Sequence, residues 1–167
     1  MYFRYIFWSD WGEEAKIVRA GMDGSARKNV ITTEIEWPNG LVVDYKDARL
    51  YWLDAHNDHG SVASSDLDGN NRKIVVKGSL PHPFAITIFG NRVYWTDWTT
   101  KSIHSCQKKN GNGKLEVKSE IESLMDLRAF EQERQPEGRL HIICIVIHGC
   151  MTSSTLDYCM ASSKIIF

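Results

Sequence analysis

One short phrase occurs three times in this chain and constrains its fold more than any other feature. The copies read Phe7-Trp8-Ser9-Asp10-Trp11, Tyr51-Trp52-Leu53-Asp54 and Tyr94-Trp95-Thr96-Asp97-Trp98. Measured from Trp to Trp, the spacings are 44 and 43 residues. A period near forty-odd residues that carries aromatic-rich strands and turn signals is typical of a β-propeller, with one four-stranded blade per repeat.

Turn residues and short apolar runs keep the same period. The hairpin positions Asp23, Asp68 and Asn110 lie 45 and 42 residues apart. Pro38 and Pro81 lie 43 residues apart. Alternation of apolar and polar residues between these turns predicts strands. The predicted strands with defined bounds cover residues 41–44, 50–54, 72–76, 84–89, 93–97, 102–106 and 124–130, the last as the inner strand of a following blade.

The chain is short for a closed ring of this kind. It has 167 residues, whereas a closed six-bladed propeller with this period needs roughly 260. We therefore predict an all-β fold with about three of six propeller blades over residues 4–136, followed by an unrelated tail at 137–167. Because part of a propeller leaves blade edges open, we also expect poor solubility of the isolated chain.

Composition excludes several classes of partner. The net charge is −1 without a basic block, which argues against nucleic acid and anionic membrane surfaces. The sequence as written predicts no signal peptide, since the first repeat begins almost at once. It predicts no membrane anchor, since its longest apolar run, residues 142–147, is too short to span a bilayer. The four cysteines form no C-x-x-C pair and do not decide the redox compartment.

The residues that recur in every copy are best interpreted as scaffold. Asp10, Asp54 and Asp97 could be taken for catalytic acids, but their recurrence once per blade predicts that each accepts hydrogen bonds from backbone donors at a blade junction. The aromatic residues of the same phrases are predicted to pack between blades. These are Trp8, Trp52 and Trp95.

Residues that differ between repeats are the better binding candidates. The turns that lead into the inner strands lie around a propeller's central channel, where a rigid scaffold presents variable loops. An exposed aromatic ring beside an amide suits peptide recognition, because the ring offers apolar area and the amide both a donor and an acceptor. The candidate ligand-binding residues are Trp37, Asn39, His82, Phe84, Trp98 and Met125, with Trp11 expected on the same face.

The repeat phrases resemble the class B, or YWTD, repeats of the low-density-lipoprotein receptor group. Longer stretches, at residues 20–25, 37–41, 75–85 and 132–136, resemble the first propeller of the LDL-receptor-related Wnt co-receptors, the branch that includes Arrow. This resemblance covers residues 4–136. It implies an extracellular propeller on the plasma membrane that binds Wnt proteins or secreted Wnt antagonists on its top face. The parent protein would act with a Frizzled-type receptor, and Asn39 would receive an antagonist's Asn-containing loop.

Two other binding functions share this repeat, and one enzymatic function shares the six-bladed propeller fold. An endocytic lipoprotein-receptor propeller and a laminin-binding matrix propeller carry the same phrase. The residues at 78–85 and 133–136 favour the co-receptor. Calcium-dependent propeller hydrolases gather acids around the channel, whereas the inward turns here supply mainly Trp, Asn, His and Pro. We therefore predict no enzymatic activity and no cofactor.

The remaining candidate sites are weak. His141, Cys144, His148 and Cys150 fit no known zinc-ligand spacing. The stretch 66–70 lacks the glycine and the glutamate of a calcium loop. His104 and Cys106 alternate on one predicted strand without a third group to orient them. We predict neither a metal site nor a catalytic residue.

Overall fold

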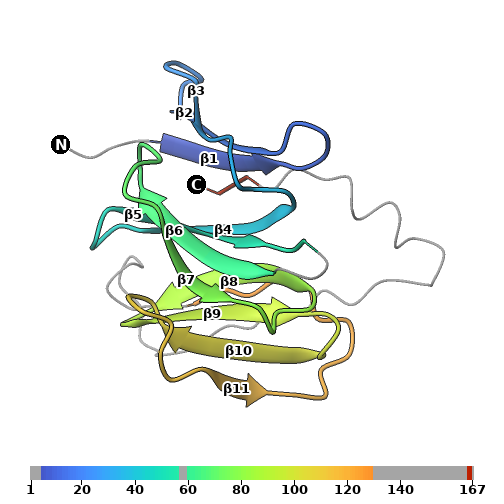
Figure 1. Ribbon diagram of the computed structural model, residues 1–167. Helices are drawn as coiled ribbons and strands as arrows, with labels where there is room; N and C mark the ends of the chain where they lie inside the picture. The colour runs from blue at the N-terminus through green and yellow to red at the C-terminus, as the bar shows by residue number, and fades with distance from the viewer. Residues whose placement is uncertain (1–4, 57–59, 130–164, 167) are drawn as a thin grey trace.

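The structure is a computed structural model that describes residues 5–56, 60–129 and 165–166. The described residues form three four-stranded antiparallel sheets and no helix, so the predicted all-β fold of four-stranded blades is confirmed (Figure 1). The first blade has the strand order β12-β1-β2-β3, the second β4-β5-β6-β7 and the third β11-β10-β9-β8. The strands are β1 Tyr5–Asp10, β2 Lys16–Gly21, β3 Lys28–Ile31, β4 Pro38–Asp44, β5 Arg49–Asp54, β6 Ser61–Asp66, β7 Lys73–Lys77, β8 Pro83–Phe89, β9 Arg92–Asp97, β10 Ser102–Gln107, β11 Leu115–Lys118 and β12 Ile165–Ile166.

The repeated tryptophans occupy equivalent positions in the sheets, whereas the predicted match of Pro38 with Pro81 is wrong: Pro38 pairs with Asp54 as Pro83 pairs with Asp97. Trp52 pairs with Leu41 on one side and Ala63 on the other. Trp95 pairs in the same register with Ile86 and His104. β4 and β8 each have an irregular register near the first residues of the strand. The common register explains why the repeat phrase keeps its spacing, because a shift by one residue would turn every side chain to the opposite face.

Apolar side chains fill the space between neighbouring blades. The cluster between the first and second blades contains Phe7, Ile17, Leu41 and Trp52 among its buried members. The cluster between the second and third blades centres on Trp95, which is 0% exposed. Burial of each such side chain contributes about 1.5–3 kcal/mol to folding. The blades are therefore held together face to face, as in a propeller.

Hairpin glycines bring the backbones of neighbouring blades into direct contact. Gly69, between β6 and β7, has a φ of +89° and Gly111, between β10 and β11, a φ of +72°. A Cβ atom at either glycine would overlap the carbonyl oxygen of Val30 or Val75 in the outer strand of the preceding blade. Glycine is required at both positions for its positive φ and for this close approach.

The predicted strand at residues 124–130 is wrong for the residues that the structure describes. Residues 124–129 form no strand, although Leu124 and Leu127 are buried against the third blade. The Ala129 amide donates to Thr87 Oγ1 rather than to a strand ladder. Apolar burial alone does not make a strand, since a ladder needs a neighbouring backbone in register. The last predicted residue, Phe130, lies outside the described residues.

Only a small part of the predicted tail is described. β12 pairs antiparallel with β1 through Phe7–Ile166 and Trp8–Ile165. It thus lies beside β1 where β4 and β8 lie beside the Trp strands of their own blades. The apolar run at 142–147 and the four weak zinc candidates lie outside the described residues. No helix in the described part is long and apolar enough to cross a membrane.

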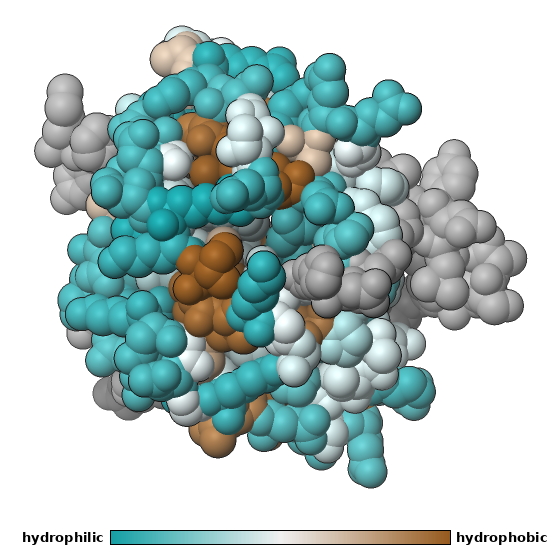
Figure 2. Space-filling model, viewed as in Figure 1, coloured by the Kyte–Doolittle hydropathy of each residue, from teal (hydrophilic) through white to brown (hydrophobic). Residues whose placement is uncertain are grey.

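The outer surface mixes hydrophilic side chains with small apolar patches. Figure 2 shows one face of the molecule, on which apolar side chains gather in separate patches within a mainly hydrophilic surface. Ile74 on β7 and Leu115 and Val117 on β11 are half exposed. Single exposed apolar side chains are normal, so these positions do not by themselves mark a binding site.

Candidate functional site

Strand direction brings the loops with candidate binding residues to one end of the blades. Pro38 at the start of β4 pairs with Asp54 at the end of β5, and Pro83 at the start of β8 pairs with Asp97 at the end of β9. The connections into β4 and β8 therefore lie beside the turns that follow β5 and β9. We call the surface formed by these loops, together with the β1–β2 turn, the top face.

The repeated aspartates hold the top-face connections in place. Asp54 accepts hydrogen bonds from the backbone amides of Glu36 and Trp37, at 3.0 and 2.9 Å. Asp97 accepts from the amides of His82 and Thr100, both at 3.0 Å. Both carboxylates are buried, so each replaces the water that these amides would otherwise bind. Asp10 is half-buried.

The repeated tryptophans differ in burial. Trp52 and Trp95 are fully buried, whereas Trp8 in the first blade is half-buried. Each of the three carries a cation over its ring, and sequence reasoning missed this feature. The three cations are Arg27, Arg72 and Lys114, at 5.2, 5.2 and 5.9 Å from the ring centroids. Their spacings of 45 and 42 residues match those of the hairpin positions and could have revealed them.

In the third blade, three of the predicted binding residues contact one another. Trp98 stacks on His82 at 5.1 Å and on Phe84 at 4.1 Å between ring centroids. The Trp98 amide donates to the His82 carbonyl oxygen. Phe84 is 8% exposed and belongs to a buried cluster, against which Met125 also packs. This group is largely closed on itself and offers little of Phe84 to a partner.

In the second blade, the candidates are more open. Trp37 is half-buried and meets the His56 ring edge to face at 5.4 Å. His56 Nε2 lies 2.9 Å from Glu36 Oε2. Asn39 Nδ2 donates to the Pro83 carbonyl oxygen at 3.1 Å, so this amide connects two blades. Within the described part of the chain, the Asn39 side-chain oxygen and the second N–H of Nδ2 remain for a ligand as acceptor and donor.

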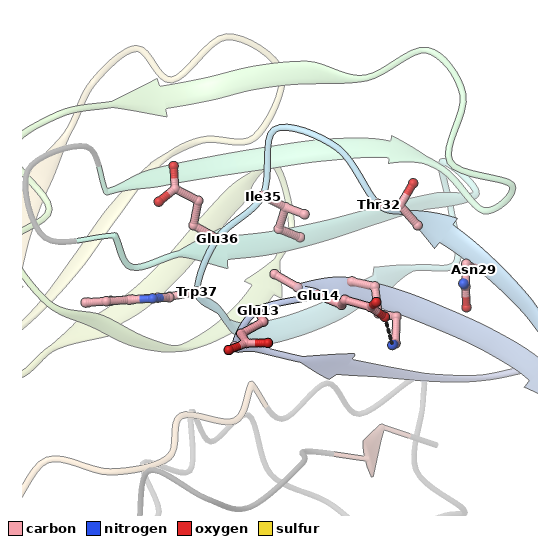
Figure 3. A pocket seen from close by; sticks show the side chains of 10 residues that line it. Glu13, Glu14, Asn29, Thr32, Ile35, Glu36 and Trp37 are labelled. Carbon is pink, nitrogen blue, oxygen red and sulfur yellow. Dashed lines mark ion pairs between the residues drawn. The ribbon is translucent and has the colours of Figure 1, made fainter.

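A pocket of about 490 Å³ lies between the first two blades at the top face. The β1–β2 turn forms one wall, and the connection into β4 forms the other (Figure 3). Its lining residues are Gly12, Glu13, Glu14, Ala15, Lys16, Asn29, Thr32, Ile35, Glu36 and Trp37. Sequence reasoning identified Trp37 here but missed the glutamates, because the sequence pattern that indicates binding is an aromatic ring beside an amide.

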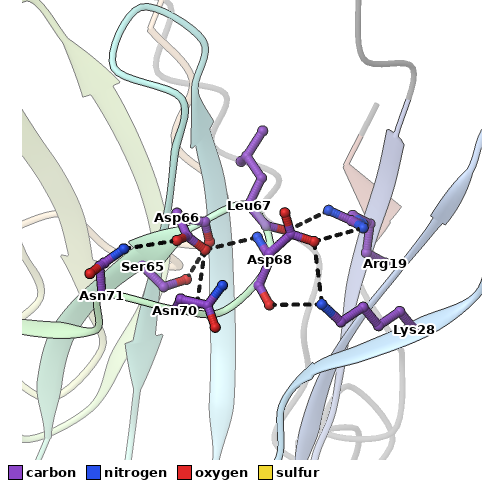
Figure 4. A network of polar contacts seen from close by, with 8 residues as sticks. All are labelled: Arg19, Lys28, Ser65, Asp66, Leu67, Asp68, Asn70 and Asn71. Carbon is purple, nitrogen blue, oxygen red and sulfur yellow. Dashed lines mark hydrogen bonds and ion pairs between the residues drawn. The ribbon is translucent and has the colours of Figure 1, made fainter.

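Charged groups at the bottom of the blades join the first blade to the second. Asp68, in the β6–β7 hairpin, lies 3.0 Å from Arg19 and 3.3 Å from Lys28 (Figure 4). Asp66 Oδ1 accepts from the Asp68 and Asn70 amides within the same hairpin. Residues 66–70, the stretch considered above as a calcium loop, therefore stabilise a turn and its contact with the first blade.

The next junction places an ion pair inside the protein. Lys108 Nζ, on a side chain that is 3% exposed, contacts the buried carboxylate of Asp44 and lies 3.0 Å from Asp47. Burial alone would lower the pKa of Lys108, but hydrogen bonds from the ammonium to the two carboxylates outweigh it and raise the pKa above 10.5. Nothing in the local sequence Lys108-Lys109-Asn110-Gly111 indicates burial.

Two further candidates of the sequence analysis lie on β10. His104 stacks on Trp95 at 5.6 Å between ring centroids. Cys106 is a buried free cysteine, and burial raises the pKa of its thiol to about 11. A thiol with this pKa is protonated at neutral pH and is a poor nucleophile.

Comparison with known proteins identifies the repeats. The profile of the low-density lipoprotein receptor repeat class B matches residues 4–45 and 48–89, half of the chain. The vitellogenin receptor Yl of Drosophila melanogaster is 36% identical over 155 residues, which cover 93% of this chain and 7% of that protein. The vitellogenin receptor of Solenopsis invicta is 40% identical over 106 residues, covering 64% of this chain and 6% of that protein.

A solved structure shares the fold alone. A protein of Lactobacillus plantarum superposes with a TM-score of 0.51 at 14% identity, over 72% of this chain and 38% of that one. At this identity the likeness concerns the arrangement of strands and not the activity. The chain thus spans a small fraction of the two curated receptors that it matches and about a third of the length of this structural neighbour.

Proposed function

This chain belongs to the low-density lipoprotein receptor class B repeat family, and on that premise we propose that it is part of a receptor ectodomain that binds vitellogenin or a related secreted protein on its top face. The similarity to two insect vitellogenin receptors supports this ligand class over the other functions that the repeat can serve. The same similarity favours a receptor over an enzyme.

The observation that carries the top-face assignment is the exposure of aromatic rings there. Trp11, which follows the repeat phrase of the first blade, is 45% exposed. Trp37 is half-buried and lines the neighbouring pocket. Rigid aromatic side chains at the centre of an interface supply most of its binding free energy. Two such residues on loops held by a rigid scaffold form a suitable surface for a protein ligand.

A direct test is binding of vitellogenin to the immobilised full chain by surface plasmon resonance. We expect Trp11→Ala and Trp37→Ala each to weaken binding at least about tenfold, or ~1.4 kcal/mol. Tyr45→Ala is the matched control, because Tyr45 is a 62% exposed aromatic residue in the β4–β5 turn at the opposite end of the blade. Equal affinities for all four proteins, with unchanged melting temperatures, would contradict the proposal.

The Wnt co-receptor function is the second candidate. Its support is the position of Asn39 next to Trp37, since the family resemblance assigns this asparagine to an antagonist's Asn-containing loop. With Nδ2 bonded to Pro83, the Asn39 oxygen would accept a hydrogen bond from the ligand. In that case the parent protein would act with a Frizzled-type receptor at the extracellular face of the plasma membrane.

Residues 78–82, part of the stretch that resembles the co-receptors, also have a structural role. Gly78 and Ser79 both have positive φ angles, of 74° and 55°. Leu80 is 2% exposed, and the His82 amide is capped by Asp97. The stretch from 78 to 82 therefore satisfies the demands of a turn between blades, which any class B repeat could share. The resemblance in this stretch is therefore weak evidence for a Wnt co-receptor over a vitellogenin receptor.

Parallel binding measurements separate the two candidates. A Wnt antagonist that binds the wild-type chain and loses at least about tenfold affinity on Asn39→Ala would favour the co-receptor. The melting temperature of the variant must be measured as well, because the substitution also removes the hydrogen bond to Pro83. Binding of vitellogenin but not of the antagonist would favour our first candidate.

A further inference from the structure

We propose that the top-face pocket between the β1–β2 turn and the connection into β4 binds an arginine side chain of the protein ligand. This inference rests on the proposed function, because it names the chemistry of one contact on the same face. The pocket volume of about 490 Å³ exceeds what one side chain needs, so the arginine would enter with part of its backbone. Three features of the pocket select this occupant.

The first feature is the excess of carboxylates in the wall. Glu13, Glu14 and Glu36 line the pocket, and Lys16 is the only lysine or arginine among its lining residues. Lys16 Nζ lies 3.9 Å from Glu14 Oε2 and so offsets that carboxylate. No hydrogen bond or ion pair within the described part of the chain engages Glu13. Glu36 Oε2 already lies 2.9 Å from His56 Nε2, so Glu13 is the carboxylate whose acceptors are unused for a cation.

The second feature is the pair of aromatic residues. The Trp37 ring lines the pocket, and Trp11, next to the lining residue Gly12, is 45% exposed. Within the described ranges, no ring contact engages Trp11. A single exposed indole does not by itself mark a binding site, so Trp11 supports the inference only together with Trp37 in the pocket wall. The presence of Trp37 in the wall is an observation independent of the charge of the wall.

The third feature is the shape of an arginine side chain. A guanidinium group stacks its flat face on an aromatic ring and directs several N–H donors at carboxylates in its plane. Lysine offers a compact charge without this flat face, and an acidic or neutral side chain lacks the donors. Figure 3 shows Glu13 of the β1–β2 turn close to Trp37 of the connection into β4, while the Glu36 carboxylate is directed away from Glu13. Glu13 and Trp37 thus suit a planar cation that contacts both walls.

The test uses the full chain and the peptide acetyl-Gly-Gly-Arg-Gly-Gly-amide. Its control peptide carries citrulline, which has the same shape as arginine without the charge. The indole N–H signals of the six tryptophans are followed by two-dimensional NMR, and Trp37→Phe assigns the signal of interest. We expect the arginine peptide to shift the Trp37 signal in a dose-dependent manner, with the citrulline peptide binding at least roughly tenfold more weakly.

Matched variants distinguish the pocket from general attraction. The double variant Glu13→Gln, Glu36→Gln should lose the arginine-dependent shift, while Glu122→Gln, at an exposed position on another turn, should keep it. The signals of the buried Trp52 and Trp95 report that the variants remain folded. Equal binding of the two peptides, or an unchanged shift in the double variant, would overturn the inference.

Vitellogenin binding separates this inference from the proposed function. If vitellogenin binds the wild-type chain and the double variant equally well, the pocket assignment is overturned and the proposed function stands. If the arginine peptide binds as expected and vitellogenin does not bind the folded wild-type chain, the pocket assignment stands and the proposed ligand class is wrong.

Discussion

The two blade junctions share one backbone contact but differ in the ion pairs beside it. At both, a hairpin glycine of one blade lies against an outer-strand carbonyl of the preceding blade. Between the first and second blades, the ion pairs involve Asp68, whose side chain is 54% exposed. Between the second and third, Lys108 and Asp44 are 3% and 1% exposed. The repeat thus determines the backbone contact and leaves the charges beside it free to differ.

This difference has energetic consequences. Ion pairs at the surface contribute about 0–1 kcal/mol, because water competes for both partners. A buried pair adds little net stability when complete, but removal of one partner leaves an uncompensated charge inside the protein. The second junction should therefore be far more sensitive to single substitutions than the first. The matched lysines Lys108 and Lys28 allow a direct comparison.

The largest expected effect is that of Lys108→Met. This change leaves Asp44 buried without its counter-charge and should lower the free energy of unfolding by about 3–5 kcal/mol. Urea denaturation followed by tryptophan fluorescence measures the loss. Addition of Asp44→Asn should recover part of it, because the remaining group is then neutral. A loss below about 1 kcal/mol would mean that water reaches this site.

Asp97→Ala should come second. The change removes the acceptor of the His82 and Thr100 amides, and a buried donor without a partner costs about 1–3 kcal/mol. Thermal unfolding of this variant and of Asp54→Ala, which exposes the Glu36 and Trp37 amides in the second blade, compares equivalent positions. An unchanged melting temperature for Asp97→Ala would exclude its role as a structural acceptor.

Lys28→Met, the counterpart of Lys108→Met at the first junction, should have a small effect. Lys28 lies 3.3 Å from Asp68, and its side chain is 48% exposed. Arg19 remains beside the same carboxylate. We expect a loss of at most about 1 kcal/mol in the same urea experiment. A loss as large as that of Lys108→Met would show that exposure does not separate the two junctions.

The smallest effect concerns acid pH. The hydrogen bond from Lys108, followed by its charge, lowers the pKa of Asp47 below 3.8 in the folded protein. The stabilisation by Asp47 is therefore complete above the unfolded-state pKa of about 3.9 and is lost as pH falls through the folded-state value. Melting temperatures between pH 6 and roughly pH 2 should show this decline in Lys28→Met but a weaker one in Lys108→Met. Parallel curves would contradict the coupling.

The parts of the fold that follow from the period could be predicted, and the parts that depend on neighbouring blades could not. The recurring phrase locates β5 and β9 to within a residue, because every blade satisfies the same register. Residues 124–129 carry the same apolar signal but lack a ladder partner among the described residues, so no strand forms there. Burial of Lys108 is likewise invisible locally, since it results from a turn of the preceding blade.

The candidate site divides in the same way. The period placed Trp37, Asn39, His82 and Trp98 on loops at one face. It could not show that Trp98 stacks with His82 and Phe84, or that Asn39 bonds to Pro83, because these contacts join residues from different strands or blades. The glutamates of the pocket differ from the corresponding residues of the other repeats, but the pattern of an aromatic ring beside an amide does not select them.

The glycine-to-carbonyl contact sets how closely the backbones of neighbouring blades approach at this point. Because no side chain lies between Gly69 and Val30, or between Gly111 and Val75, the approach of the two backbones at these points does not depend on the size of a side chain there. The charges beside this contact can therefore differ between junctions, as they do here, while the contact itself is retained. A receptor built on this contact can acquire a new ligand by changing the top-face loops of one blade, without redesign of the others.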